Sequence, residues 1–195
     1  MIILYFAVIS IIVALVRGGK IKRLGELQIR QIWLIYIPPT IIASFVIARK
    51  LGYGDLVHAT SGWLHLFSYC TLFIFVGLNR RLTGVWLLAA GLSLNMLVLV
   101  ANHGLMPVSY NAAQLARMSP KALRIFRGDT MSRHVLLSEK TRLSFLSDVI
   151  AVPSPPFPSG EVISPGDVVL AFGVFILIQA AILPIKRKSA ADSKT

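Results

Sequence analysis

The sequence predicts an all-α membrane protein, a bundle of about five transmembrane helices with a long extracytoplasmic loop between the fourth and the fifth. Two observations lead to this fold class. Hydrophobic residues make up 55% of the chain, charged residues only 14%, and the mean hydropathy is +0.73. A soluble domain carries about a quarter charged residues, so most of this surface is suited to lipid. The apolar residues are also gathered into five segments separated by polar links.

The five apolar segments divide the chain into four parts. Each segment approaches the length of about 20 apolar residues that crosses a hydrocarbon core. We expect a four-helix region at 1–101, an extracytoplasmic loop at 102–164, a fifth helix at 165–186 and a cytoplasmic tail at 187–195. The segments themselves are Ile2–Val16, Gln31–Ala48, Ser61–Leu78, Leu82–Val100 and Asp167–Ile185.

Local signals justify each helix in turn. The first segment has neither a basic n-region nor a small-residue cleavage site, so it is interpreted as an uncleaved signal anchor or first span. Pro38-Pro39 predicts a kink in the second segment, because proline removes a backbone donor and clashes with the preceding turn. The link Asn79-Arg80-Arg81 is short enough to make the third and fourth helices an antiparallel hairpin. Ser164-Pro165-Gly166-Asp167 combines an N-cap, a proline and an acid in the first turn, which predicts the start of the fifth helix.

The distribution of basic residues predicts the orientation. If the N-terminus is outside, eleven cations lie on the inner side, in 17–30, in Arg80-Arg81 and in the C-terminal tail. The short outer link carries only Arg49 and Lys50. Loops longer than about 60 residues are translocated largely regardless of charge, so the cations of the long loop count little. We therefore expect a multi-pass protein of the cell membrane with its N-terminus out and its C-terminus in.

The loop contains few clear secondary-structure signals. Ser119-Pro120 predicts a short helix over Pro120–Arg127, stopped by Gly128. Arg133–Leu137 and Leu143–Ile150 are apolar but too short for periodicity to distinguish a helix from a strand. The proline-rich tail Val152–Ser164 is expected to be extended and without regular structure.

Two polar residues are predicted to lie inside the spans. His65 in the third segment is ionisable, and such groups are functional candidates in hydrocarbon. It could carry a proton or a ligand, it could form an interhelical hydrogen bond with Asn95 or Ser93, or it could lie nearer the interface. No Asp, Glu, Lys or Arg falls in the middle of a span, which weakens the interpretation of a proton-driven transporter.

Asn102 and His103 follow the fourth segment where it leaves the membrane. Asn95 and Asn102 are seven positions apart and therefore share one helix face. Asn102 and His103 could present donors to a headgroup or substrate at the outer interface. Alternatively they form a helix C-cap in which Asn102 or Gly104 takes a left-handed turn and Pro107 prevents continuation. The cap would explain Gly104 but not His103.

The densest polar cluster of the loop spans Arg127 to His134. Asp129 and His134 could act as acid and base, with Asp148 as a further carboxylate. Three arginines could hold an anionic group, namely Arg127, Arg133 and Arg142. In the alternative, the acids pair with these arginines and only fold the loop. The D-x4-H spacing is not a specific catalytic motif, and HExxH and GxSxG are both missing.

Metal and cofactor signatures are also missing from the sequence. Cys70 is the only cysteine, so no intrachain disulfide can form, and neither CxxC nor a Cys/His zinc pattern occurs. We therefore predict no metal site and no cofactor.

A set of short motifs covers most of the chain, up to about Lys188. It consists of Gly18-Gly19 and the basic linker after it, Ala101–Ser109, Gly128-Asp129-Thr130, Arg133-His134, Thr141-Arg142-Leu143, Phe145-Leu146, Asp148-Val149-Ile150 and Ser164–Asp167. With these residues the chain resembles a family of small multi-pass bacterial membrane proteins catalogued only as a domain of unknown function. The resemblance implies a protein of the bacterial cytoplasmic membrane. Since that family has no assigned activity, the resemblance assigns no catalytic residue.

Three classes of function remain open. The first is a non-catalytic binding or assembly protein whose basic outer loop contacts anionic lipid, envelope polymer or a membrane partner, including a second copy of the chain. The second is an enzyme acting on an anionic lipid-linked substrate at the outer interface. The third is a small oligomeric transporter or channel. Nucleic acid is not expected as a partner, because the cations adjoin apolar segments instead of forming a basic domain.

Overall fold

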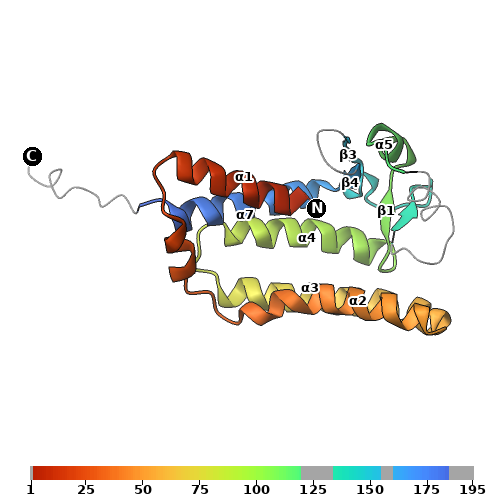
Figure 1. Cartoon of the computed structure of the whole chain (residues 1–195). Helices are drawn as coiled ribbons and strands as arrows, with labels where there is room; N and C mark the ends of the chain where they lie inside the picture. Colours follow the sequence, from red (N-terminus) through yellow and green to blue (C-terminus); the bar gives the residue numbers. More distant parts are fainter. Residues whose placement is uncertain (1, 120–133, 155–159, 185–195) are drawn as a thin grey trace, which may run out of the picture.

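The computed structural model describes residues 2–119, 134–154 and 160–184, apart from the side chain of His58. The described chain is mostly helical, and all five predicted apolar segments form helices (Figure 1). Three are long and apolar enough to cross a membrane, namely Ile32–Lys50, Ala59–Leu78 and Pro165–Ile182. The other two apolar helices, Ile2–Val16 and Val85–Ala101, are shorter.

Helices α4 (Val85–Ala101) and α7 (Pro165–Ile182) pack closely against each other. A Cβ added to Gly91 would lie 2.6 Å from the carbonyl oxygen of Gly166, and one added to Gly84 would lie 2.5 Å from that of Gly173. These two contacts run in opposite directions along the two helices, so α4 and α7 are antiparallel. Glycine at four positions is what lets the two backbones approach this closely.

Helix α1 (Ile2–Val16) covers α7 and is tied to it by polar groups. Gln179 Nε2 donates to the Ser10 carbonyl oxygen at 2.6 Å, and Ser10 Oγ donates to the Phe175 carbonyl oxygen at 2.8 Å. Arg17 donates to Gln179 Oε1 at 2.9 Å. The buried side chains of Ser10 and Gln179 thus have hydrogen-bond partners, as helix contacts in lipid require.

The prediction of a kink at Pro38-Pro39 was wrong. Residues Ile32–Tyr36 form a short 3₁₀ helix, η2, and the α-helix α2 (Ile37–Lys50) starts after it, with Pro38 and Pro39 as its second and third residues. Proline is tolerated there because the first turn of a helix has no internal partners for its N–H groups. The prolines therefore begin a helix instead of bending one.

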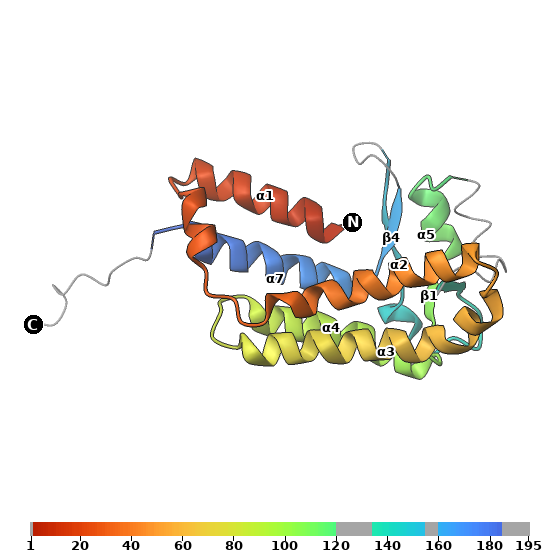
Figure 2. The ribbon, with the colours of Figure 1, turned by 60° about the horizontal axis from the view of Figure 1, so that its bottom comes forward.

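Helix α3 spans Gly54–Leu78 and starts one to two turns earlier than the sequence predicted. It runs beside α2 and contacts α4 on another side (Figure 2). The chain between α3 and α4 is short, and α3 and α4 form the expected pair of neighbours. Asn79 ends α3 by accepting from the Arg30 N–H at 2.8 Å and donating to the Arg30 carbonyl at 2.9 Å. The linkers before α2 and after α3 therefore lie at one end of the bundle.

The same end of the bundle holds the end of α7. The basic linker after α1 includes a short 3₁₀ helix, η1 (Ile21–Glu26), whose Leu24 packs on the buried cluster of Ala14, Ile178 and Ile182. The Lys20 N–H donates to the Ile182 carbonyl at 3.2 Å. Among the described residues this end carries Arg17, Lys20, Lys22, Arg23, Arg30, Arg80 and Arg81.

The described part of the loop contains four short strands at the opposite end of the bundle (Figure 1). One of them, β2, falls in the segment 133–137, for which the sequence left helix and strand open. Strand β1 (Met106–Val108) pairs in parallel with β2 (His134–Leu136), and β3 (Ile150–Val152) pairs antiparallel with β4 (Glu161–Ile163). The expectation of an unstructured Val152–Ser164 was therefore wrong for β4. A short helix α5 (Tyr110–Leu115) and the 3₁₀ turn η3 (Ser144–Leu146) complete the loop. The predicted helix over 120–127 lies outside the described residues.

Candidate functional site

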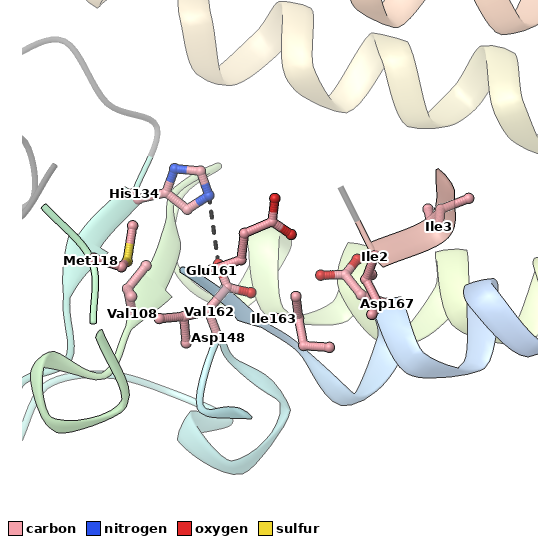
Figure 3. A pocket seen from close by; sticks show the side chains of 10 residues that line it. All are labelled: Ile2, Ile3, Val108, Met118, His134, Asp148, Glu161, Val162, Ile163 and Asp167. Atoms are coloured by element: carbon pink, nitrogen blue, oxygen red, sulfur yellow. Dashed lines mark ion pairs between the residues drawn. The ribbon is translucent and has the colours of Figure 1, made fainter. Parts of the chain in front are cut away.

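His134 and Asp148 are brought together by pairing to the same strand. His134 on β2 is aligned with Met106 of β1, and Asp148 forms an isolated parallel bridge with Val108 of β1. Met106 and Val108 are two residues apart, so their side chains, and those aligned with them, share one face of the sheet. His134 Nε2 consequently lies 3.5 Å from Asp148 Oδ2 (Figure 3).

Two more carboxylates come from the chain that leads from β4 into α7. Glu161 opens β4, opposite Val152, and Asp167 lies in the first turn of α7. Ser164 caps this helix as the sequence predicted, since its Oγ accepts from the Asp167 N–H at 3.0 Å. In return Asp167 Oδ2 accepts from the Ser164 N–H at 3.2 Å, which completes a capping box. The Asp167 carboxylate is thereby held in place by the backbone N–H of Ser164, at the start of the same helix.

Asn95 joins this cap from α4. Its Nδ2 donates to Asp167 Oδ1 at 2.8 Å, and its Oδ1 accepts from Ser164 Oγ at 2.8 Å. Asn95 and Ser164 are both buried. The Asn95 amide therefore links the start of α7 to α4, in addition to the close contacts between the glycines of these two helices. Ser93, the other hydrogen-bond candidate on α4, donates to the Ala89 carbonyl within its own helix.

These residues surround a cavity of about 300 Å³ where the loop meets the ends of α1 and α7. Figure 3 shows its polar side chains arriving from four places: β2, the segment before β3, β4 and α7. Ile2 and Ile3 of α1 form part of its apolar wall. The polar residues that line it are His134, Asp148, Glu161 and Asp167.

A second cavity of about 140 Å³ adjoins the first and is lined from the helices. It shares His134, Asp148 and Asp167 with the larger cavity, and its other polar lining comes from His65 and Tyr69 of α3 and from Asn95. The rings of His65 and Tyr69 meet edge to face with their centroids 5.4 Å apart. His65 and Asn95, predicted as polar residues within spans, thus line one cavity with the polar residues of the loop.

Burial gives Asp148 unusual acid–base properties. The residue is 5% exposed. Loss of solvation in this position, assisted by the nearby charge of Asp167, raises the pKa of Asp148 from 3.8 to about 8. At neutral pH the Asp148 carboxyl group therefore mostly carries a proton.

The remaining predicted site residues do not line either cavity among the described residues. Asn102 folds the loop: its Nδ2 donates to the Arg142 carbonyl at 2.9 Å and its Oδ1 accepts from the Arg142 N–H at 3.0 Å. His103 takes a left-handed conformation with φ of 57°, followed by Gly104 with φ of 82° against Gly62 of α3. The side chains of His103 and Arg142 are exposed. Asp129, Arg127 and Arg133 lie outside the described residues.

The carboxylates and histidines are spread around the cavity walls. Within the described parts of the chain, no group of three or more His, Cys, Asp or Glu side chains is arranged to hold a metal ion.

Sequence reasoning missed Glu161 and Tyr69 and assigned Asp167 only to a helix start. Asp167 does have that role, but the same side chain also lines both cavities. The signal that was available is the short distance along the chain between Glu161 and Asp167. Two of the eight acids of a basic protein stand within one short segment, directly before and inside a helix start.

Comparison with known proteins identifies the family of this chain. The model of a family of unknown function, DUF5317, matches residues 26–179, and the chain belongs to that family. The match includes α2, α3, α4, the described loop and most of α7, but not α1. No curated protein and no solved structure matches the chain.

Proposed function

We propose that this protein is a non-catalytic binding protein of the bacterial cell membrane, and that it holds a small polar ligand in the cavity between its loop and its helix ends. The observation that carries the proposal is the convergence of five ionisable side chains on two adjoining cavities. They come from α3, β2, the segment before β3, β4 and α7, namely His65, His134, Asp148, Glu161 and Asp167. Concave sites with a few convergent polar groups in an apolar wall are typical of ligand binding.

The proposal includes five membrane-crossing helices, with the cavity end facing outward. Three helices are long and apolar enough to cross, and the two shorter apolar helices pack against one of them. The seven described cations at the opposite end support a cytoplasmic position for that end. The described cations of the loop, Arg117, Lys140 and Arg142, are exposed. We expect them to contact anionic lipid headgroups while the cavity binds its ligand.

Labelling of single cysteines tests the orientation. In a Cys70→Ser background, Lys140→Cys marks the loop and Lys22→Cys marks the linker at the other end, and both side chains are exposed. A thiol reagent that cannot cross the membrane is expected to label the first variant in intact cells. It should label the second only after the cells are made permeable. The reverse pattern would contradict an outward-facing cavity.

Native mass spectrometry of the purified full-length protein tests the binding function. The expected result is a bound small molecule that is retained by the unsubstituted protein and lost from Val162→Trp, which fills the larger cavity. Thr60→Trp, at an exposed hydroxyl on α3 outside both cavities, is the matched control and should retain the molecule. Equal retention by all three proteins would refute a binding function of this cavity.

An acid–base enzyme is the second candidate, and the protonated Asp148 favours it. A buried carboxyl group whose pKa is raised to about 8 can donate a proton at neutral pH. An enzyme should convert the bound molecule during incubation, whereas Asp148→Asn should keep it unchanged. A binding protein should release the same molecule unchanged in both cases.

A further inference from the structure

We infer that Arg49, at the end of α2, binds a phosphate group. The phosphate can belong to the headgroup of a membrane lipid or to a soluble compound, because a guanidinium group recognises the same oxygen atoms in both. This site lies outside both cavities, so the inference does not depend on the ligand that they hold.

The guanidinium group of Arg49 has buried donors without an acceptor. Arg49 lies in the last turn of α2 and is partly buried. Its Nε and Nη1 atoms are shielded from solvent, and neither has a hydrogen-bond partner among the described residues. A guanidinium group is always charged, and a buried charge is normally paired and hydrogen-bonded. Arg49 therefore has N–H groups for an acceptor that the described chain does not supply.

No other described lysine or arginine has shielded N–H groups in this state. Arg17, at the opposite end of the bundle, shows how the fold uses an arginine to hold helices together. It donates to Gln179 Oε1 at 2.9 Å, and Gln179 in turn donates to Ser10 of α1. Arg49 has no such role between helices, which distinguishes it from an arginine that serves the packing alone.

The position of Arg49 along α2 corresponds to the depth of lipid phosphates. It is the last residue but one of Ile32–Lys50, which is long and apolar enough to cross a membrane. Figure 1 shows that the end of α2 lies at the same end of the bundle as the loop. Tyr53, just after α2, and Trp63 on α3 are 59% and 78% exposed. Exposed aromatic residues near the end of a span are typical of the membrane interface, where the phosphates lie.

The surroundings of α2 favour a phosphate as the acceptor. Only 6% of the span that contains α2 is buried, so its surface is suited to lipid. The planar fork of a guanidinium group matches two phosphate oxygens and can donate to both. Lys50, which is exposed beside Arg49, adds a second positive charge. Basic residues next to a span attract anionic headgroups.

Binding requires only that the side chain of Arg49 change its rotamer. The third nitrogen of the group, Nη2, is not among the shielded donors. Rotation about the side-chain bonds can bring the other two nitrogens to the surface on the same side. This movement breaks no hydrogen bond with the described residues, because Nε and Nη1 have none. The phosphate therefore gains its contacts with little loss elsewhere.

Thermal unfolding of the full-length protein in a non-ionic detergent, with phosphatidylglycerol added in steps, tests the lipid source. Dioleoylglycerol has similar acyl chains without a phosphate, and oleate has a carboxylate in its place. Phosphatidylglycerol is expected to raise the Tm, because a ligand of the folded state stabilises it. Dioleoylglycerol should leave the Tm unchanged, and oleate should raise it less than phosphatidylglycerol. Glycerol 3-phosphate, added at equal ionic strength, tests the soluble source.

Two variants and one control connect the response to Arg49. Arg49→Gln removes the charge and the fork, and should need at least about ten-fold more ligand for the same rise in Tm. Arg49→Lys keeps the charge but cannot donate in the same paired geometry, so it should recover only part of the affinity. Arg81→Gln removes the same charge from an exposed arginine at the opposite end of the bundle and should respond normally.

Unfolding without added ligand separates binding from a structural role. Since Nε and Nη1 of Arg49 have no hydrogen bond to lose, Arg49→Gln should unfold at the Tm of the unsubstituted protein or above it. A purely structural role of Arg49 predicts the reverse, namely a lower Tm without ligand and an unchanged response to phosphatidylglycerol.

The ligands that raise the Tm identify the source of the phosphate. A response confined to phosphatidylglycerol assigns a lipid headgroup, one confined to glycerol 3-phosphate assigns a soluble phosphate, and a response to both assigns a site for either. The inference is overturned if neither compound raises the Tm, if oleate acts as well as phosphatidylglycerol, or if Arg49→Gln responds like the unsubstituted protein. None of these outcomes bears on the cavity, whose ligand Val162→Trp tests.

Discussion

Two parts of the helix bundle are held together in different ways. Helices α1, α4 and α7 pack through close backbone contacts and buried hydrogen bonds, and 39% of the α7 span is buried. Helices α2 and α3 form a hairpin on the side of α4, and only 6% of the span that contains α2 is buried. The first group has a buried interior, to which Val76 of α3 also contributes on the side of α4. The α2–α3 hairpin presents most of its apolar side chains outward, as a surface in contact with lipid does.

The two parts of the bundle also differ in what their polar residues bond to. Ser10, Asn95, Ser164 and Gln179 are all buried at contacts between helices of the first group, and each has a hydrogen-bond partner. In the hairpin, Ser44 and Thr60 donate to carbonyl groups of their own helices. Thr40 donates to the carbonyl group of Tyr36, the residue just before α2. The four buried residues therefore join helices to one another or to the segments beside them, whereas Thr40, Ser44 and Thr60 bond locally along their own chain segment.

Among the substitutions that test this comparison, replacement of Gly91 by leucine is expected to change the free energy of unfolding most. Its Cβ would lie 2.6 Å from the Gly166 carbonyl oxygen, so the backbones of α4 and α7 would have to separate. We expect Gly91→Leu to lower the free energy of unfolding by about 3 kcal/mol. Gly77→Leu on α3, where an added Cβ meets nothing within 4 Å, should cause no loss. Thermal unfolding of both variants in detergent measures the difference, and equal stability would show that the α4–α7 contact is not close.

Replacement of Asn95 by alanine should have the next largest effect. It removes the partner of Ser164 Oγ and of Asp167 Oδ1 at a buried helix start. The expected loss in the free energy of unfolding is about 1–3 kcal/mol. Ser93→Ala, two residues away, removes only a bond within α4 and should stay within about 0.5 kcal/mol. Similar losses for the two variants would mean that Asn95 does not link the helices.

Asp148 lies in the loop, where it is buried next to the helix ends, and the pH dependence of stability should reveal its raised pKa. Because its pKa is higher in the folded protein, the folded state binds the proton more tightly. This contribution to stability is complete below about pH 4 and is lost as the pH rises towards 8. Asp148→Asn should therefore be more stable than the unsubstituted protein at pH 8 by about 1–2 kcal/mol, with a smaller advantage at pH 5.

Thermal unfolding of the Asp148→Asn variant and of the unsubstituted protein between pH 5 and pH 8 measures that advantage. Asp55→Asn serves as the control and should show the same difference from the unsubstituted protein at every pH. A constant difference for Asp148→Asn as well would contradict a raised pKa.

A substitution on the outer surface of α3 should have the smallest effect. Trp63 is 78% exposed. We expect Trp63→Leu to change the free energy of unfolding in detergent by less than about 0.5 kcal/mol, since the ring has few protein contacts to lose. A loss above about 2 kcal/mol would show that this face of the hairpin packs against protein, for example against a second copy of the chain.

The helices were predictable from the sequence, and the loop was largely not. Hydropathy located all five helices, and the Ser164–Asp167 start was confirmed in each of its components, because a capping box involves only neighbouring residues. Pro38-Pro39 was misinterpreted because the same proline either bends a helix or begins one, depending on where the helix starts. The strands could not be assigned from the sequence because each has three residues, which is too short for periodicity to distinguish a strand from a helix. The segments 133–137 and 143–150 were for that reason left open between the two.

The candidate site was predictable only in parts. The sequence did identify four residues of the site as candidates for acid–base chemistry or hydrogen bonding, namely His65, Asn95, His134 and Asp148. Nothing in their spacing indicated that they line shared cavities. His134 and Asp148 meet because both align with β1, a strand far from each of them in the chain. Glu161 was overlooked because two acids in one short segment match no specific catalytic or binding motif.

The sequence by itself determined that this is a mostly helical protein with lipid-compatible helices, where its last helix starts, and that its cations adjoin apolar segments. Those properties depend on composition and on residues a few positions apart. Only the tertiary structure decided which helices pack closely, that Asn95 joins α4 to α7, and that three acids of a basic chain line one cavity. The reason is physical: burial, strand register and the raised pKa of Asp148 arise from contacts between residues distant in the chain.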